Sequence, residues 1–188
     1  MNNDGYPDIY VSNDFFERDY LYINQKNGTF KDEMEQWFQH TSFSSMGADI
    51  GDINNDGLMD IYVCNTIKAD STLRYNLLYV NQGVDKDGVP HFKDMAKEYG
   101  LADTTQSTMA YFFDYDNDGD LDIVVNNIDE PALLYENNSN DKKERSYIEV
   151  KLKGDEKNIN AIGARVIVYA KNEIRTYEKY PVKGFLSS

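Results

Sequence analysis

Two similar segments of ten residues, 62 positions apart, constrain how this chain can fold. Asp52–Ile61 reads Asp-Ile-Asn-Asn-Asp-Gly-Leu-Met-Asp-Ile, and Asp114–Ile123 reads Asp-Tyr-Asp-Asn-Asp-Gly-Asp-Leu-Asp-Ile. The same offset aligns Phe30–Val63 with Phe92–Val125 without a gap. A repeat sustained over this length indicates a series of small, similar structural units that share a continuous core.

A third copy opens the chain. Asn2–Ile9 matches Asn54–Ile61 at an offset of 52. The residue before Met1 would hold the first aspartate of this copy, so we expect the first loop to be truncated and the chain to be a piece of a longer protein.

Each acidic segment leads into short runs that are typical of β-strands. Buried first strands are predicted at Ile9–Val11, Ile61–Val63 and Ile123–Val125, and second strands at Leu21–Asn24, Leu78–Asn81 and Leu134–Asn137. Glycine turns are expected at Asn27-Gly28 and Asp87-Gly88, third strands from Phe30 and Phe92, and a helical turn at Lys93–Tyr99 before Gly100.

These units are too short for parallel strands joined by long helices. We therefore predict an all-β fold with β-propeller blades, a partial propeller of about 2.5 to 3 repeats over residues 1–137. A three-stranded solenoid remains the alternative. Residues 138–146 form a polar linker, and residues 147–188 form part of a small β module, with strands expected at Tyr147–Leu152, Ile162–Tyr169 and Ile174–Tyr180.

The repeated loops, at residues 1–9, 52–60 and 114–122, have the spacing of a calcium site. Loop positions 1, 3, 5 and 9 offer side-chain oxygens, position 6 is glycine, and position 7 offers its carbonyl. The predicted ligands are Asp52, Asn54, Asp56, Leu58 and Asp60 in one complete loop; Asp114, Asp116, Asp118, Asp120 and Asp122 in the other; and Asn2, Asp4, Tyr6 and Asp8 in the truncated loop.

Carboxylates that converge on one point repel each other unless a cation neutralises them. Neither His nor Cys accompanies the loops, which argues against zinc, whereas magnesium remains possible. An EF-hand is excluded because a strand signal follows each loop and because Val63 and Val125 stand where the bidentate glutamate would be.

Charge and cysteine content narrow the possible partners. The net charge of −14 disfavours nucleic acid and anionic membrane surfaces. No apolar run is long enough for membrane insertion. Cys64 is the single cysteine, so no intramolecular disulfide can form, and a core thiol is expected. His40 and His91 are expected at turns or at the surface, and the Phe15–Tyr20 connection is expected to pack between blades, with a glycan-contact loop as the alternative.

Asp52–Val63 and Asp114–Val125 resemble the calcium loops of FG-GAP/VCBS repeats, the blades of integrin-α-type β-propellers, and Asn2–Val11 resembles a truncated third. Tyr147–Phe185, with its Ile162–Val166 segment, resembles the start of an ASPIC/UnbV domain. The resemblance implies a calcium-stabilised protein of the extracellular space, cell surface or periplasm, which acts as an adhesion or interaction scaffold for a protein or glycan and has no catalytic residues. The alternative is the non-catalytic propeller part of a larger secreted carbohydrate-active enzyme. A glycosidase-like carboxylate pair is not formally excluded by the sequence.

Overall fold

The structure is a computed structural model that describes residues 1–14, 17–66, 75–87, 89–139, 147–170 and 173–182. The described residues form four antiparallel sheets and one short helix, which confirms the predicted all-β class. Phe15, Phe16, Gly88 and most of the predicted linker lie outside them. Within these residues, no helix is both long and apolar enough to cross a membrane.

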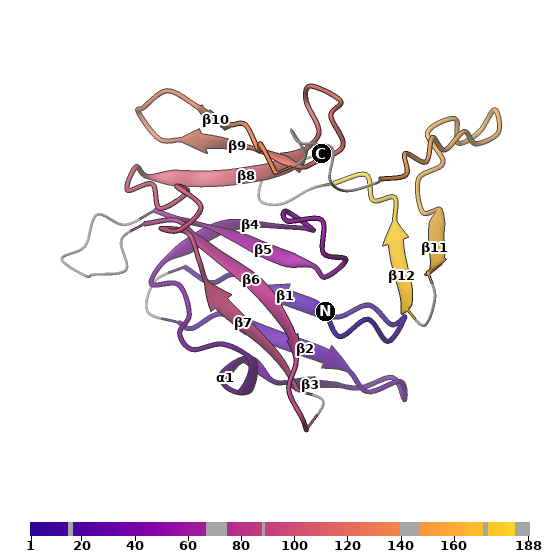
Figure 1. The fold of residues 1–188 in the computed structure, drawn as a ribbon, viewed down its shortest axis with the longest axis horizontal. Helices are drawn as coiled ribbons and strands as arrows, with labels where there is room; N and C mark the ends of the chain where they lie inside the picture. Colours follow the sequence, from indigo (N-terminus) through magenta and orange to yellow (C-terminus); the bar gives the residue numbers. More distant parts are fainter. Residues whose placement is uncertain (15–16, 67–74, 88, 140–146, 171–172, 183–188) are drawn as a thin grey trace.

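The first three sheets are stacked one above another, and the fourth lies to one side of the stack (Figure 1). The first contains β1 (Ile9–Val11), β2 (Tyr20–Asn24) and β3 (Phe30–Asp32), with α1 (Met34–Trp37) following it. The second contains β4 (Ser45–Gly51), β5 (Asp60–Asn65), β6 (Leu77–Val84) and β7 (Pro90–Asp94). The third contains β8 (Ser107–Phe113), β9 (Asp122–Asn127) and β10 (Leu133–Tyr135), and the fourth is the hairpin of β11 (Arg165–Ala170) and β12 (Glu173–Glu178).

The sequence repeat is also a structural repeat. β8 and β9 begin and end 62 residues after β4 and β5, and the β4–β5 and β8–β9 pairs both shift register at equivalent positions, after Ser45 and Ser107. The sheets are open, and closure into a propeller stays a prediction.

The central strand β5 is buried on both faces. Ile61 and Val63 pack into a core shared with the first sheet, and Tyr62 and Cys64 pack into a core shared with the third. This explains why the strand is continuously apolar rather than alternating. Cys64 is fully buried, and burial holds the pKa of its thiol far above the ordinary range, which agrees with a core role.

The strand that precedes each loop was not predicted individually. β4 turns Gly47 and Gly51 toward β8, where larger side chains do not fit. A Cβ atom on Gly47 would stand 2.6 Å from the carbonyl oxygen of Thr108. Because small residues fill the inward positions of β4, hydrophobic alternation does not reveal this strand.

One other expectation needs correction. Tyr147–Leu152 alternates as a half-buried strand should, yet the structure gives it no strand pairing, and Ile148 is 80% exposed. The alternation was a wrong indicator here because no strand within the described part of the chain pairs with this segment.

The helical turn expected before Gly100 is present as a single turn. Residues 96–100 form a turn in which the amide of Tyr99 donates to the carbonyl of Met95 at 3.0 Å, and the equivalent segment of the preceding repeat forms α1.

We expect Gly47→Ala to destabilise the fold more than Gly51→Ala. The added methyl group at Gly47 meets backbone, which cannot move aside, whereas at Gly51 it meets the side chains of Leu121 and Phe112. Overpacking of this kind costs about 1–3 kcal/mol. Urea unfolding of both variants measures the difference, and equal losses would contradict the predicted close approach of β4 and β8.

His40 joins the first two sheets rather than standing free at a turn. Its Nε2 lies 3.6 Å from Oδ2 of Asp94, at the end of β7, and its ring packs 5.7 Å from that of Tyr79. The hydrogen bond to Asp94 raises the pKa of His40. Burial acts to raise the pKa of Asp94, but the hydrogen bond from His40 and the backbone amides hold it below its usual value.

These opposite shifts predict a pH window for the pair. The contribution of His40 to stability is lost as the pH rises through its raised pKa, and that of Asp94 is lost as the pH falls through its lowered pKa. Both are present between about pH 4 and 6.5. An NMR titration should give His40 a pKa above the ordinary value of about 6.5, and Asp94→Asn should lower it.

Candidate metal-binding loops

The three loops share one backbone conformation. An asparagine at loop position 4 and a glycine at position 6 have a positive φ in every copy. The asparagines are Asn3, Asn55 and Asn117, and the glycines are Gly5, Gly57 and Gly119. Asparagine tolerates the left-handed region better than most residues, and glycine adopts it at no steric cost. All three loops lie at the edge of the stacked sheets that faces the β11–β12 hairpin (Figure 1).

In the second loop, backbone amides orient the acidic side chains. Asp52 accepts hydrogen bonds from the amides of Asp56 and Gly57 at 3.0 and 2.8 Å. Asn54 Oδ1 accepts from the amide of Asp56 at 3.0 Å, and Asp56 accepts from that of Leu58 at 2.8 Å. The loop is therefore wound around its own side-chain oxygens.

The third loop repeats these contacts. Asp114 accepts from the amides of Asp118 and Gly119 at 3.2 and 3.1 Å. Asp116 accepts from the amide of Asp118 at 3.3 Å, and Asp118 accepts from that of Asp120 at 3.0 Å. Two segments with different residues at positions 2, 3, 7 and 8 thus reach one geometry, because the contacts join backbone amides to side-chain oxygens that both segments have at positions 1, 3 and 5.

The aspartate at position 9 ties each loop to the sheet below it. Asp60 accepts from the amide of Ile53 at 3.0 Å and from that of Asn81, on β6, at 2.8 Å. Asp122 accepts in the same way from the amides of Tyr115 and Asn137, at 2.9 and 2.8 Å. Both aspartates are fully buried.

Burial makes these carboxyl groups electrostatically costly. It raises the pKa of Asp60 to about 7; the amides of Asn81 and Ile53 act to lower it, and the charges of Asp56 and Asp52 raise it. Burial raises the pKa of Asp52 as well. In the second loop, the hydrogen bonds from backbone amides therefore do not fully offset the cost of burying the carboxylates in their charged form.

In the third loop, three carboxylates meet. One oxygen each of Asp114, Asp116 and Asp122 lie within 4.8 Å of one another. Calcium binds oxygen at about 2.3–2.6 Å, so ligands on opposite sides of one ion stand about 5 Å apart. The trio fits one such ion, and its all-oxygen chemistry suits a hard divalent cation. The equivalent trio of the second loop contains the amide of Asn54 in place of one carboxylate.

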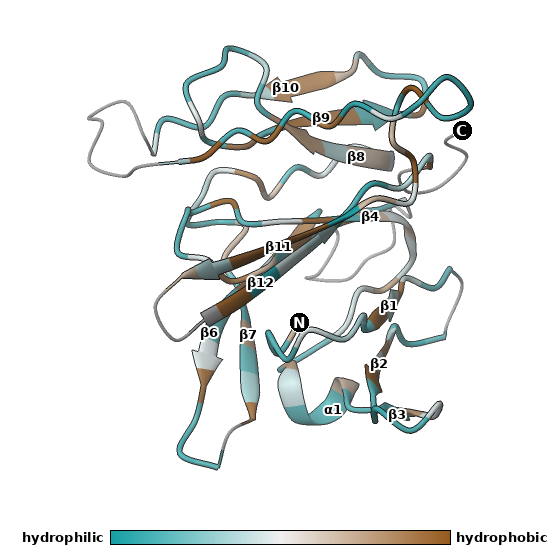
Figure 2. Cartoon of the chain, turned by 90° about the vertical axis from the view of Figure 1, so that its right-hand side faces the viewer, coloured by the Kyte–Doolittle hydropathy of each residue, from teal (hydrophilic) through white to brown (hydrophobic). Residues whose placement is uncertain are grey.

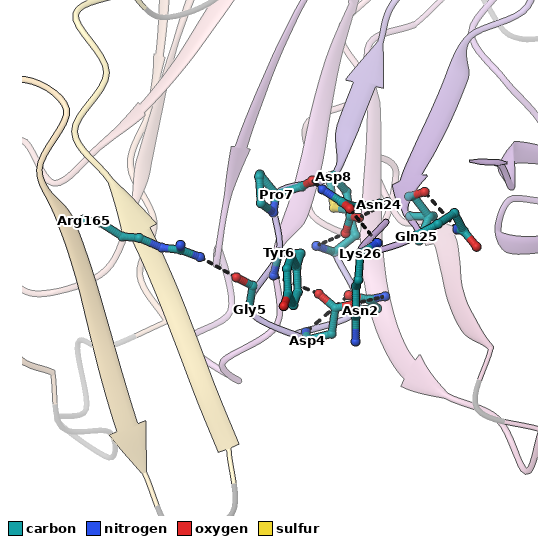
Figure 3. A network of polar contacts seen from close by, with 12 residues as sticks. Asn2, Asp4, Gly5, Tyr6, Pro7, Asp8, Asn24, Gln25, Lys26 and Arg165 are labelled. Atoms are coloured by element: carbon teal, nitrogen blue, oxygen red, sulfur yellow. Dashed lines mark hydrogen bonds and ion pairs between the residues drawn. The ribbon is translucent and has the colours of Figure 1, made fainter. Parts of the chain in front are cut away.

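The first loop keeps part of this arrangement (Figure 3). Asp4 accepts from the amide of Tyr6 at 2.9 Å, and Asp8 accepts from that of Asn24 at 2.9 Å. The terminal ammonium group of Met1 lies 3.0 Å from Asp8 and occupies the place of the position 2 amide. This positive charge and Lys26, 3.2 Å from Asp4, stand close to the loop. The predicted carbonyl ligands of Tyr6, Leu58 and Asp120 stay predictions, as does the full ligand set.

Three asparagines with a structural role at the loops were not predicted as site residues. Asn24 ends β2, Asn81 lies within β6 and Asn137 follows β10; the backbone amide of each donates to the position 9 aspartate of its loop, and the side chain of each donates to the position 8 carbonyl. The side chain of Asn137 donates to the carbonyl of Leu121 at 3.1 Å and to that of Ile53, in the preceding loop, at 2.8 Å. The signal was present, because a Leu-Tyr-x-Asn sequence recurs after each loop.

Comparison with known proteins gives one finding for part of the chain. Residues 1–63 match the family model of the FG-GAP-like repeat. This match contains the truncated first loop, the first sheet and the complete second loop with the start of β5. No curated protein matches the chain. The ASPIC/UnbV resemblance of the C-terminal module stays a prediction.

We expect Asn137→Ala to destabilise the protein by about 1–3 kcal/mol, because two backbone carbonyls lose their donor. Asn24→Ala is the matched control: its side chain donates to the carbonyl of Pro7 at 3.2 Å, within its own unit. Its cost should be the smaller of the two in urea unfolding. Equal costs would show that the contact between successive units adds nothing.

Proposed function

We propose that this chain is a calcium-binding repeat segment that acts as an interaction scaffold rather than as a catalyst. The observation that carries the proposal is the third loop, where the carboxylates of Asp114, Asp116 and Asp122 converge within 4.8 Å. The matching hydrogen bonds of the second loop support a second site there.

The calcium would bind to Asp52, Asn54, Asp56, Asp60 and the Leu58 carbonyl in the second loop. In the third loop it would bind to Asp114, Asp116, Asp118, Asp122 and the Asp120 carbonyl. The first loop would contribute Asn2, Asp4, Asp8 and the Tyr6 carbonyl, but Lys26 already brings positive charge to it. We therefore expect the two complete loops to bind calcium more tightly than the first loop.

A location outside the cytoplasm follows from the same proposal. Calcium loops in extracellular modules bind with Kd values of about 10⁻⁴–10⁻³ M. The match to the FG-GAP-like repeat supports an extracellular or periplasmic interaction module. The scaffold would present its exposed surface to a protein or glycan, and its net charge of −14 disfavours nucleic acid. The domain division at residues 137 and 147 belongs to this proposal.

Thermal unfolding with calcium and with EDTA tests the metal sites. A ligand at 100 times its Kd stabilises by about 2.7 kcal/mol per site. For a chain of this size that corresponds to a rise in Tm of about 5–10 °C per site. Asp116→Ala should lose part of the rise, because it removes one of the three converging carboxylates.

The matched control is Asp87→Ala, which removes an exposed acid from a turn that lacks the loop spacing. Its calcium-dependent rise should equal that of the wild type. No rise with calcium, or the same rise with magnesium, would contradict a calcium-selective site. An equal loss in the two variants would point to a general charge effect.

A further inference from the structure

The C-terminal segment touches all three loops at the same loop position. The guanidinium group of Arg165, on β11, donates a hydrogen bond to the carbonyl of Gly5 (Figure 3). A Cβ atom on Gly57 would overlap the guanidinium group of Arg175, on β12, and a Cβ atom on Gly119 would overlap the ring of Tyr147. In each loop the contacted residue is the position 6 glycine.

Glycine explains why these contacts form there. Gly57 and Gly119 have left-handed backbones, with φ of 91° and 94°, and their missing side chains leave the backbone open to a flat group. A guanidinium group fills that space in one loop, and a phenol ring fills it in the other. The glycines thus serve both the loop turn and the contact with the C-terminal segment.

The two complete loops differ in the charge of the side chain that lies against their position 6 glycine. Arg175 brings a positive charge to the second loop, because its guanidinium group lies against Gly57. Tyr147 brings an uncharged ring to the third loop. A guanidinium group near a cation site repels a divalent ion, so the two loops should not bind calcium equally.

The hairpin is attached to the repeats mainly by such local contacts. Among the described residues, neither of the two buried cores contains a residue of β11 or β12. Between the first loop and the hairpin lies a cavity of about 420 Å³, whose lining includes Tyr6, Arg165 and Tyr177. The hairpin lies across one side of the stacked sheets (Figure 2), without a shared core to hold it there. Docking of this kind is easily reversed.

We propose that the β11–β12 hairpin docks reversibly on the position 6 glycines of the first and second loops, and that Arg175 is a resident counter-cation that competes with the divalent ion at the second loop. This inference rests on the proposed calcium function. Because coupling between two ligands is reciprocal, calcium in the second loop weakens docking by the same factor by which docking weakens calcium binding.

Calcium titration calorimetry on loop-specific backgrounds tests the competition. In Asp116→Ala, where the third loop is impaired, adding Arg175→Gln should tighten calcium binding at the second loop by about fivefold or more. Adding Arg175→Lys, which keeps the charge, should leave the affinity near that of the background. In Asp56→Ala, where the second loop is impaired, Arg175→Gln should leave the affinity of the third loop unchanged.

An unchanged affinity of the second loop in Arg175→Gln overturns the competition, as does an equal gain in both loops. If no variant binds calcium, the proposed function fails and the competition fails with it. The docking contact is tested without calcium, so that the two failures can be told apart.

For docking, we compare amide hydrogen exchange of residues 165–178 in three variants. Gly57→Ala puts a methyl group into Arg175, and exchange in the hairpin should become faster, whereas Gly119→Ala puts one into Tyr147, outside the hairpin, and should have the smaller effect. Gly5→Ala is the matched control, because its φ of 82° imposes the same backbone strain but its Cβ meets nothing within 4 Å. Equal exchange in all three variants overturns the docking.

Discussion

The buried aspartate at the ninth loop position is the constraint on which the rest of the structure depends. Asp60 and Asp122 each accept one hydrogen bond from a backbone amide at the start of the loop. Each accepts a second one from the backbone amide of the asparagine that lies on or just after the neighbouring strand of the unit. A single carboxylate thereby fixes the loop, the strand that follows it and the neighbouring strand. Burying an ionised carboxylate is costly unless hydrogen bonds and positive charge surround it, and this cost supports the proposed cation.

The same contacts relate one unit to the next. The backbone amide of Asn137 donates a hydrogen bond to Asp122, and its side-chain amide donates one to the carbonyl of Ile53 in the preceding loop. Asn81 makes the corresponding contact with the carbonyl of Met1, at 3.4 Å. The shape of each loop is therefore coupled to the spacing between sheets. An ion that orders the loop would stabilise more than nine residues, since successive loops and sheets share these hydrogen bonds.

The sequence was most informative where a residue's role is local. The loop acids, the glycines at position 6 and the apolar strands such as Ile61–Val63 have recognisable signals, because turn chemistry and burial act on the residues themselves. β4 escaped individual prediction because its inward side is made of small residues that fit closely against β8. The strand predicted at Tyr147–Leu152 was wrong for the opposite reason: its pattern is clear, but pairing depends on a partner strand that its own residues do not specify.

The contact between the hairpin and the loops could not be predicted at all, for a physical reason. Arg165 begins one short strand and Arg175 lies within the next, and both look like ordinary solvated side chains. Their importance comes from the groups that they contact. These are loop backbones that have no side chain at position 6, in a chain with many more acidic than basic residues. Where negative charge is concentrated in loops, any nearby cation stabilises it, whether it is an ion from solution or a guanidinium group of the same chain. The second loop has Arg175 beside it, whereas the third loop has the uncharged ring of Tyr147. Two loops with the same spacing of acidic residues therefore have different electrostatic surroundings because of residues that lie far from the second loop in the sequence.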